Sequence, residues 1–568
     1  MSRPAPAPSV DRIGRSLDLA GLVLVLLAIA PALGNDLIWD DRFLIEEVDG
    51  LGDPAELGSM LSSPFWENSS YLETDLQEYW RPVTTLLLWV GGALFGKWAP
   101  GFHALSVGAL LAAAVGLYAV ARRAFSRPGH RAALYWLSVL FVVHPLASEV
   151  VCLTANLADH LVLASLALAV AALGHAYREP GRRALYLPLA GLAAAAAAGS
   201  KELGILAALA PLVAVWVEKS ADPDISWRLL RRPGPWVSTA TPVVIYLVGR
   251  HLVTTAAGHG GTTLPEFGRY AEIVFYGLGQ ALARTLAPLP TGSRTVVETG
   301  SAAAVALSIL AIGLVAFAVV RLVLTRQKVD MISGGVLVSL GLLLPSLLGA
   351  EHHGDAVHIP TRYYHPALAG ILLAVSPLAV ARWNRRLHVL AVVVAALLTL
   401  LSWIRVDEWS DNVSFFAADA VYHPREREAQ LNHLRALTNA ARYDEAYELL
   451  ERIEEMPEAD EPRFRARLMN DRATLLLAMT GEVNVASNIL KDALALDPQN
   501  LGNLLDLASM RVVAGRPDEA VVILRMGLDS PYFHDYRREA ILDRLRRYEA
   551  LAREADLDPD EVDWSAAP

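Results

Sequence analysis

The sequence contains one cysteine, Cys152, among 568 residues, so no disulfide can form within the chain. Charged residues are also scarce, at 19% of the chain, and the formal net charge of −11 argues against nucleic acid as a partner. What the chain has in abundance is apolar: 54% of its residues are hydrophobic and the mean hydropathy is +0.35. Runs rich in alanine, leucine and valine supply most of this excess, which indicates a membrane protein.

The sequence also gives no sign of a metal site. It has no CxxC pair and no spacing typical of zinc ligands. Glu351, His352, His353, Asp355 and His358 lie close together, but their spacing matches no metal motif. We interpret this segment as a solvated polar loop and expect no cofactor.

Thirteen apolar runs are candidates for membrane spans. Basic clusters separate many of them, and the positive-inside rule places these clusters in the cytoplasm. If the runs at 81–97 and 271–289 crossed the membrane, the clusters at Arg122 and at Arg326/Lys328 would lie outside. We therefore predict that these two runs are juxtamembrane helices at the outer surface and that eleven others span. The predicted spans are 17–34, 102–121, 131–148, 157–176, 184–199, 202–218, 236–254, 302–324, 332–349, 365–381 and 388–404.

This arrangement places the N-terminus in the cytoplasm and everything after Trp403 outside. The segment from Asp36 to Tyr79 becomes an outer loop with twelve acidic residues and one basic residue, Arg42. The loops 290–301 and 350–364 lie on the same side. Ala30-Pro31-Ala32 also fits the cleavage site of a signal peptide, but the aspartates that follow favour an uncleaved anchor.

From about Trp409 the sequence becomes charged, helical and repetitive. The stretches "ARYDEAYELL", "GEVNVASNIL" and "GRPDEAVVIL" align on Ala446, Ala486 and Ala520, and the last two alanines are 34 residues apart. This is the tetratricopeptide period, with a small residue where two helices touch. A generic helical bundle is the alternative, and the fixed period favours tetratricopeptides. We therefore divide the chain into a transmembrane domain (1–404), a connector (405–426), a repeat domain with a capping helix (427–555) and a disordered tail (556–568).

Several ionisable residues lie near the outer ends of the predicted spans, where charge is costly and therefore a candidate for function. Taken singly, each has an ordinary alternative: Lys201 and Glu202 could pair within a turn, and Arg250 could reach the headgroups. Together on one face, they argue for a site with carboxylates at the top and cations near the membrane. The candidates around a donor are Arg81, His144, Glu149, Asp159, Lys201, Glu202, Arg250, Arg362 and Tyr363. Taken alone, Asp40 and Asp41 fit a solvated turn that closes a span, because acidic outer loops are common.

A lipid phosphate at the membrane surface suits such a site. Arginine binds phosphate through two parallel N–H donors, and lysine supplies a compact positive charge. A carboxylate beside the phosphate can deprotonate an incoming hydroxyl. Transfer of a sugar from a lipid phosphate needs no second carboxylic acid, unlike glycoside hydrolysis, because phosphate leaves as a stable anion. An aspartate of ordinary pKa would then act through its positioning, with charge stabilisation by the cations.

The order of the segments resembles one family. "LIWDDRFLIEEVDG", "YWRPVTTLLLWVGGALFG", "HPLASEVV…LAD", "SKE" and "RYYHP", followed by tetratricopeptides, are similar to the transmembrane-and-tetratricopeptide O-mannosyltransferases, GT-C-fold enzymes that use polyprenyl-phosphate sugars. The resemblance implies that Asp40 is the base and Asp41 its neighbour. The chain departs from the family at Asn156-Leu157, where Gly-Arg is usual, and at Thr361, where Glu is usual.

We therefore expect an all-α, polytopic GT-C glycosyltransferase with about eleven spans, juxtamembrane helices and C-terminal tetratricopeptide repeats. It would move one sugar, mannose by the resemblance, from polyprenyl phosphate to a hydroxyl on a protein docked at the repeats. A glycolipid or polysaccharide acceptor and a non-catalytic envelope scaffold remain alternatives. A divalent metal on Asp40 and Asp41 also stays open, although no third ligand is evident. The expected location is a bacterial inner membrane, with the repeats in the periplasm.

Overall fold

The computed structural model describes residues 10–66, 79–256, 266–324, 330–353, 356–456, 461–533, 536–559 and 562. The chain divides into two compact units, Met1–Asn412 and Val413–Pro568. The division lies within the segment 405–426 that the sequence analysis assigns to a connector.

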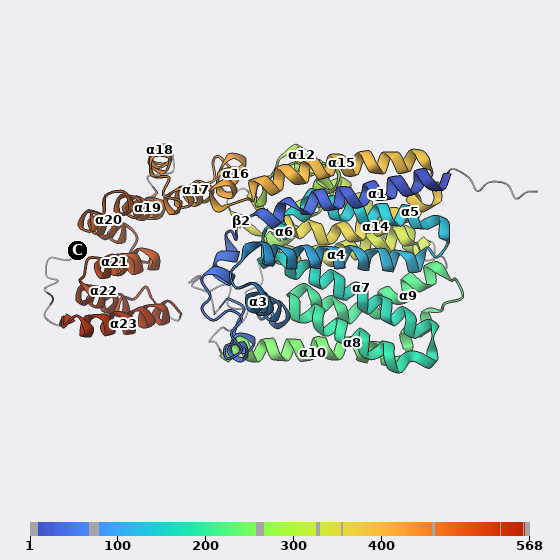
Figure 1. Cartoon of the computed structure of the whole chain (residues 1–568), viewed down its shortest axis with the longest axis horizontal. Helices are drawn as coiled ribbons and strands as arrows, with labels where there is room; N and C mark the ends of the chain where they lie inside the picture. Colours follow the sequence, from blue (N-terminus) through green and yellow to red (C-terminus); the bar gives the residue numbers. More distant parts are fainter. Residues whose placement is uncertain are drawn as a thin grey trace, which may run out of the picture. The chain divides into compact units, whose positions relative to one another are not determined.

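Unit 1 consists mainly of long apolar helices that run side by side in Figure 1. Its helices are α1 (Val10–Ile29), α2 (Leu57–Ser62), α3 (Pro82–Phe95), α4 (Ala99–Ala124), α5 (Arg131–Val143), α6 (Ser148–Cys152), α7 (Leu157–Arg178), α8 (Arg183–Ser200), α9 (Ala210–Ala221), α10 (Pro233–Ala256), α11 (Phe267–Leu286), α12 (Ala302–Leu324), α13 (Met331–Leu343), α14 (Tyr364–Arg382) and α15 (Arg385–Glu408). Phe102, Trp136 and Phe141 are fully buried between them. The outer faces of α10, α12 and α15 expose leucine, valine and isoleucine, as expected of helices in contact with lipid.

Eight helical segments of the described chain are long and apolar enough to cross a membrane. A ninth results if the bent pair α5 and α6 counts as one span, and these nine coincide with nine of the eleven predicted spans. The other two predictions, 184–199 and 236–254, fall on helices α8 and α10. With 18 and 24 residues both helices are long enough to cross, but neither is among the segments that are also apolar enough. The chain is a multi-pass membrane protein of the all-α class.

The two runs predicted to lie at the surface do not qualify as spans. α3 has 14 residues, about 21 Å of helix, which is shorter than the hydrocarbon core of a bilayer. α11 is amphipathic: Ile273 and Tyr276 are buried, whereas Arg269 is exposed. The basic cluster at Arg326 and Lys328, on which the prediction for 271–289 relied, lies outside the described residues.

The predicted span 131–148 is not one straight helix. α5 ends at Val143, and the chain bends by 52° before it continues as the 3-10 turn η5 (Pro145–Ala147) and α6. Proline disfavours the helical conformation of the residue before it, and His144 accordingly adopts φ −69° and ψ 132°. Nδ1 of His144 then accepts the N–H of Leu146 at 3.2 Å and caps the new turn.

The loops predicted at 290–301 and 350–364 pair with each other. They contribute the strands β1 (Arg294–Glu298), β2 (Glu351–His353) and β3 (Ala356–Pro360) to an antiparallel sheet with the order β1-β3-β2. Valine and isoleucine favour the pleated surface, and Val357 is buried in it. The interpretation of the histidine cluster as a solvated loop is therefore wrong for His358, which is buried in β3, while Asp355 lies outside the described residues.

Unit 2 is described here by itself. Its helices are α16 (Asn412–Tyr422), which begins at the division, α17 (Arg427–Asn439), α18 (Tyr443–Glu454), α19 (Pro462–Thr480), α20 (Val483–Leu496), α21 (Leu501–Val513), α22 (Pro517–Asp529) and α23 (Tyr536–Glu554). α17 contacts α18, α19 contacts α20 and α21 contacts α22. Ala446, Ala486 and Ala520 are fully buried on the second helix of each pair. The tetratricopeptide assignment stays a prediction, and most of the tail 556–568 lies outside the described residues.

Candidate active site

The segment that follows α1 is fastened to the end of α15. The Nδ2 of Asn35 donates to the carbonyls of Val406 at 3.0 Å and Trp409 at 2.9 Å. The N–H of Asp36 donates to the carbonyl of Ser410 at 2.9 Å. Residues beyond 404 therefore help to position the aspartates that come next in the chain.

The aspartate pair lies between two departures from regular backbone. Trp39 has φ 47°, a left-handed conformation that is costly for a bulky side chain, and its N–H donates to Asn412 Oδ1 at 2.9 Å. Arg42–Glu46 forms a π-helical turn, η2, a feature that is frequent at functional sites. Asp40 and Asp41 are thus placed by a constrained backbone.

Asp41 is fully buried. Its Oδ2 accepts the N–H of Thr154 at 2.7 Å, and its Oδ1 accepts the N–H of Ala155 at 2.6 Å. Both donors belong to η6 (Thr154–Asn156), the turn that leads into α7, where free N–H groups favour an anion. Burial nevertheless raises the pKa of Asp41 to about 8, and the charge of Asp40 adds to the rise. Asp41 therefore joins the aspartate segment to α7.

Asp40 is only partly buried, and the described contacts give it no hydrogen-bond partner. Burial raises the pKa of its carboxyl, while the positive charges of Arg362 and Arg81 oppose that rise. The expectation of a base with an ordinary pKa is thus corrected. A raised pKa makes ionised Asp40 a stronger base, and the two arginines keep the ionised form accessible.

The aspartate pair also bears on the question of a metal. Asp41 directs both carboxylate oxygens to backbone N–H groups. Within the described parts of the chain, no group of three or more histidine, cysteine, aspartate or glutamate side chains is placed to hold a metal ion.

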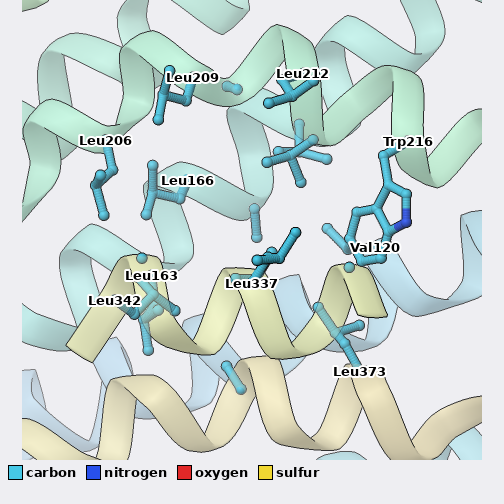
Figure 2. Close-up of a pocket in the computed structure, with 18 of the residues that line it drawn as sticks. Val120, Leu163, Leu166, Leu206, Leu209, Leu212, Trp216, Leu337, Leu342 and Leu373 are labelled. Atoms are coloured by element: carbon cyan, nitrogen blue, oxygen red, sulfur yellow. The ribbon is translucent and has the colours of Figure 1, made fainter. Parts of the chain in front are cut away.

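An apolar cavity of about 420 Å³ lies between α4, α7, α9, α13 and α14 (Figure 2). In the view, Leu206 lies near one end of the lining and Trp216 near the other. Aliphatic and aromatic side chains form the lining, and the volume falls in the range of ligand-binding cavities. The cavity therefore suits a hydrocarbon ligand.

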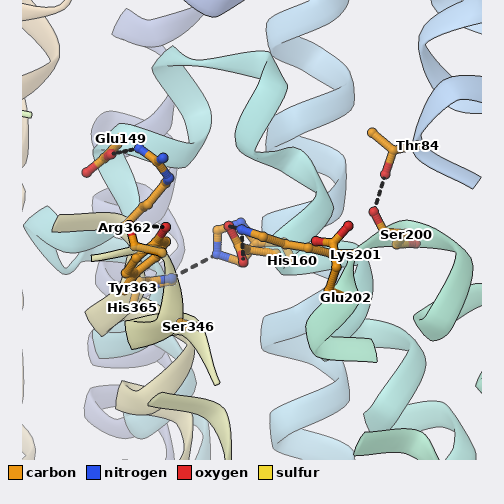
Figure 3. A network of polar contacts seen from close by, with 12 residues as sticks. Thr84, Glu149, His160, Ser200, Lys201, Glu202, Ser346, Arg362, Tyr363 and His365 are labelled. Carbon is orange, nitrogen blue, oxygen red and sulfur yellow. Dashed lines mark hydrogen bonds and ion pairs between the residues drawn. The ribbon is translucent and has the colours of Figure 1, made fainter. Parts of the chain in front are cut away.

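Carboxylate–cation pairs lie near the N-terminal end of α7, one of the helices that line this cavity (Figure 3). Lys201 Nζ donates to the two oxygens of Asp159 at 2.8 and 2.7 Å. Arg81 binds Glu202 through Nε at 3.2 Å and through Nη2 at 2.8 Å. Burial lowers the pKa of Lys201, and Asp159 opposes that shift.

A third pair adjoins these two. Arg362 Nη1 donates to Glu149 Oε1 at 3.3 Å. The other oxygen, Oε2, is buried without a hydrogen-bond partner in the described structure, and Arg405 Nη2 lies 3.9 Å from it. The centroid of the Tyr363 ring lies 5.8 Å from Lys201 Nζ and 5.4 Å from the Arg362 guanidinium, so the ring contacts the cations of both the first and the third pair.

The cluster has one more cation than carboxylates. Its cations are Arg81, Lys201, Arg362 and Arg405, and its carboxylates are Glu149, Asp159 and Glu202. Ionised Asp40 balances the surplus charge. In the described contacts Arg362 uses one of its five N–H donors and Lys201 two of three, so both can bind an additional anion.

The cluster and the cavity occupy consecutive turns of the same elements. On α7, Asp159 is followed one turn later by Leu163, which lines the cavity. On the 3-10 segment η8 (Glu202–Leu209), Glu202 is followed by Leu206 in the same way. The arrangement suits an amphipathic ligand that has an anionic head and a hydrocarbon tail.

Two predicted donor-binding residues lie apart from these ion pairs. His144 caps the bend between α5 and α6, and its Nε2 lies 3.4 Å from the Thr285 carbonyl, so its contacts serve the fold. Arg250 lies one turn after Tyr246 on α10. The Tyr246 hydroxyl donates to the Trp80 carbonyl at 3.1 Å, which places Arg250 near the margin of the site.

Sequence reasoning missed Arg405 and His365. Arg405 is buried on α15 and donates to the Gly292 carbonyl at 2.7 Å, but an arginine near the outer end of a span resembles a headgroup anchor in sequence. His160 adjoins Asp159 in the chain. Its partner His365 is more than two hundred residues away, so only the fold shows the pair.

Comparison with known proteins finds only distant similarities. No protein-family model and no curated protein matches the sequence. The crystal structure of ArnT from Cupriavidus metallidurans bound to undecaprenyl phosphate is similar at 14% identity and a TM-score of 0.40, covering 95% of this chain and 88% of that chain. The Archaeoglobus fulgidus oligosaccharyltransferase tethered with an acceptor peptide shows 13% identity and a TM-score of 0.32, covering 75% and 58%. At this distance neither similarity assigns a family or a substrate to the chain.

Proposed function

We propose that the chain is an inverting GT-C glycosyltransferase that moves a monosaccharide from a polyprenyl-phosphate donor to a hydroxyl acceptor. The observation that carries the proposal is the charged cluster one turn away from the apolar cavity, on the same helical elements. A polyprenyl phosphate matches this arrangement of a charged cluster beside an apolar cavity, because it joins an anionic head to a long hydrocarbon tail.

In this proposal the phosphate binds the donors that Lys201 and Arg362 leave unused. The tail occupies the cavity between α7 and α13, and the sugar extends toward Asp40. The placement of the sugar between the phosphate and Asp40 is supported by the electrostatic attraction of the Asp40 carboxylate to Arg362 and Arg81.

The reaction is a single displacement. Ionised Asp40 accepts the proton of the acceptor hydroxyl while the oxygen of that hydroxyl forms a bond to the anomeric carbon. The bond from that carbon to the phosphate oxygen breaks, and the electron pair leaves with the lipid phosphate. Lys201 and Arg362 stabilise the charge that develops there. The anomeric configuration inverts because the acceptor attacks opposite to the leaving group.

The acceptor and the location belong to the same proposal. The resemblance stated above favours mannose as the sugar and a protein hydroxyl as the acceptor. Unit 2, with its helix pairs and buried alanines, would then act as tetratricopeptide repeats that dock the acceptor. The site would face the periplasm from a bacterial inner membrane, since the positive-inside rule places the basic loops in the cytoplasm.

A non-catalytic scaffold is the competing function. A scaffold has no use for a partly exposed aspartate that lacks a hydrogen-bond partner in the described structure, or for a buried cluster with unused donors. Both features cost stability and therefore favour a site over a structural joint.

Native mass spectrometry of the purified protein tests the proposal. We expect wild type to retain a polyprenyl-phosphate monosaccharide. Lys201→Met should lose the lipid, whereas Lys219→Met should keep it, because Lys219 binds only the backbone carbonyls of Pro223 and Ile225 in the described structure. Wild type without such a lipid, or equal retention in both variants, would overturn the proposal.

A further inference from the structure

Two buried histidines join α7 to α14 at the level of the charged cluster. His160 lies on the first turn of α7 and His365 on the first turn of α14, and both are fully buried. Nε2 of His160 lies 2.8 Å from Nδ1 of His365 (Figure 3). Nε2 of His365 lies 3.0 Å from the carbonyl oxygen of Phe141, so the chain of bonds reaches α5 as well.

The partners fix the tautomers of both rings. A carbonyl oxygen only accepts, so His365 carries its proton on Nε2 and accepts on Nδ1. His160 must then donate from Nε2. A protonated ring would stand near Lys201 and Arg362, while Asp159, the adjacent carboxylate, already binds Lys201, so both rings are neutral. Nδ1 of His160 remains an acceptor, and it is buried without a partner in the described structure.

The pair lies where the cluster meets the cavity. Asp159, which precedes His160, holds Lys201, and Arg362 lies one turn before His365. The ring of Phe141, which lines the cavity, lies 4.3 Å from His365 and 6.2 Å from His160 between ring centroids. Each histidine thus lies close in sequence to a residue that holds or supplies a cluster cation: His160 follows Asp159, the partner of Lys201, and His365 follows Arg362.

We infer that the His160–His365 bond is a positioning element that sets the spacing between Lys201 and Arg362 for the lipid phosphate. The inference rests on the proposed function. Lys201 depends on Asp159 at the start of α7, and Arg362 immediately precedes α14, so the bond between these helix ends fixes the two halves of the phosphate site. A pair that only filled the core would not need a buried acceptor without a partner, because apolar side chains fill the same volume at lower cost.

Conservative variants of His160 separate the effect of its hydrogen bond to His365 from the effect of its side-chain volume. Asparagine places its amide near Nδ1 of a histidine, and glutamine places it near Nε2. His160→Asn therefore loses the bond to His365, whereas His160→Gln keeps an N–H donor for it. We expect His160→Asn to bind polyprenyl phosphate, supplied without sugar, about 2- to 12-fold more weakly than wild type, the range for one neutral hydrogen bond. His160→Gln should remain within about twofold.

The test is titration of purified full-length protein with polyprenyl phosphate, followed by native mass spectrometry and by the melting temperature without lipid. Weaker binding in His160→Asn at a melting temperature equal to that of His160→Gln supports the inference. Equal lipid affinity in wild type and both variants overturns it, as does a loss of affinity in both that follows their melting temperatures. Absence of binding in wild type would instead contradict the proposed function.

Discussion

Unit 1 buries carboxylates among cations at both ends of the same helix, but the two clusters differ in how fully their oxygens are used. At the C-terminal end of α7, Glu218 is fully buried, and its two oxygens accept from Arg123 and from Arg178. Asp159 lies at the other end of α7, about 29 Å along the helix from Arg178. There the oxygen Oε2 of Glu149, a residue of α6, has no hydrogen-bond partner in the described structure. One cluster is saturated and the other is not.

We interpret the Glu218 cluster as structural and the cluster near Asp159 as a binding site. Around Glu218 no space is left: a Cβ atom on Gly174 would lie 2.3 Å from the Glu218 carboxylate. The cluster near Asp159 instead adjoins the apolar cavity, which Leu163 and Leu206 line. Charge and burial are common to both ends, so the oxygen of Glu149 without a hydrogen-bond partner in the described structure, together with the adjacent cavity, is what favours the end near Asp159 as the proposed ligand site.

The largest effect is expected from the base. Asp40→Asn should lower turnover about 10²- to 10⁴-fold, because the amide cannot accept the proton while its size is unchanged. Single-turnover transfer with bound donor measures this, with donor occupancy checked by mass spectrometry. Asp36→Asn, an exposed neighbour, is the control and should retain its rate. A loss confined to donor affinity would contradict the role of Asp40 as base.

The saturated cluster should respond in stability instead. Glu218→Gln leaves two arginines around a neutral amide and should cost about 3–5 kcal/mol of the free energy of unfolding. Turnover per folded molecule should stay within about threefold, because no transition-state contact is lost. Glu179→Gln, in a partly exposed ion pair at the same end, should change neither quantity measurably. If Glu218→Gln lost turnover at an unchanged melting temperature, the structural role of the Glu218 cluster would be contradicted.

Removal of one arginine at either end sharpens the comparison. Arg362→Ala should raise the Michaelis constant for the lipid donor about 10- to 150-fold, which corresponds to about 1.5–3 kcal/mol for one charge-assisted contact. Arg178→Ala removes the same charge beside Glu218 and should leave that constant unchanged. Steady-state kinetics with varied donor measures both variants, and equal increases would refute a phosphate site confined to the outer end.

The smallest effect concerns pH. Asp40 must be ionised to accept a proton, so kcat/KM should fall as the pH drops through its pKa, which burial raises above 3.8. Arg81→Gln removes a charge that opposes this rise, so the acidic limb should move to higher pH, by about one unit or less. Arg42→Gln, whose arginine pairs with Glu47, should leave the limb in place. A limb that stays fixed or moves down in Arg81→Gln would contradict the electrostatic coupling.

The same shift has a consequence for stability. Because folding raises the pKa of Asp40, the protonated carboxyl is favoured in the folded state. Its contribution to stability is complete below pH 3.8 and is lost as the pH rises through the folded pKa. Ionised Asp40 thus lowers the stability of the fold in the pH range where we propose that it acts as a base.

The sequence identifies much of unit 1 because apolar length and loop charge are local properties. It predicts helices at α3 and α11 that do not cross. It also names Lys201 and Arg362 as candidate donor-binding residues, and that role stays a prediction. It does not reveal the bend at Pro145, because apolar periodicity continues through the proline. It also misses the pairing of β1 with β3, in which Arg294 lies opposite Pro360, because sheet partners are set by distant segments.

The site shows the same division between local and distant information. Asp40 and Asp41 are adjacent in sequence and look equivalent there. The fold distinguishes them, since both oxygens of Asp41 accept the N–H groups of Thr154 and Ala155, while Asp40 has no hydrogen-bond partner in the described contacts. Those donors lie more than a hundred residues away, so only the structure separates the positioning of Asp41 from the proton transfer that we propose for Asp40.

The most direct test of the account is a cryo-electron microscopy map of the purified protein with polyprenyl phosphate. We predict phosphate density within about 2.7–3.2 Å of donor atoms on Lys201 or Arg362. Continuous tail density should run from there through the cavity toward Trp216. A lipid headgroup beside Glu218, or a cavity that stays empty at saturating lipid, would contradict the account.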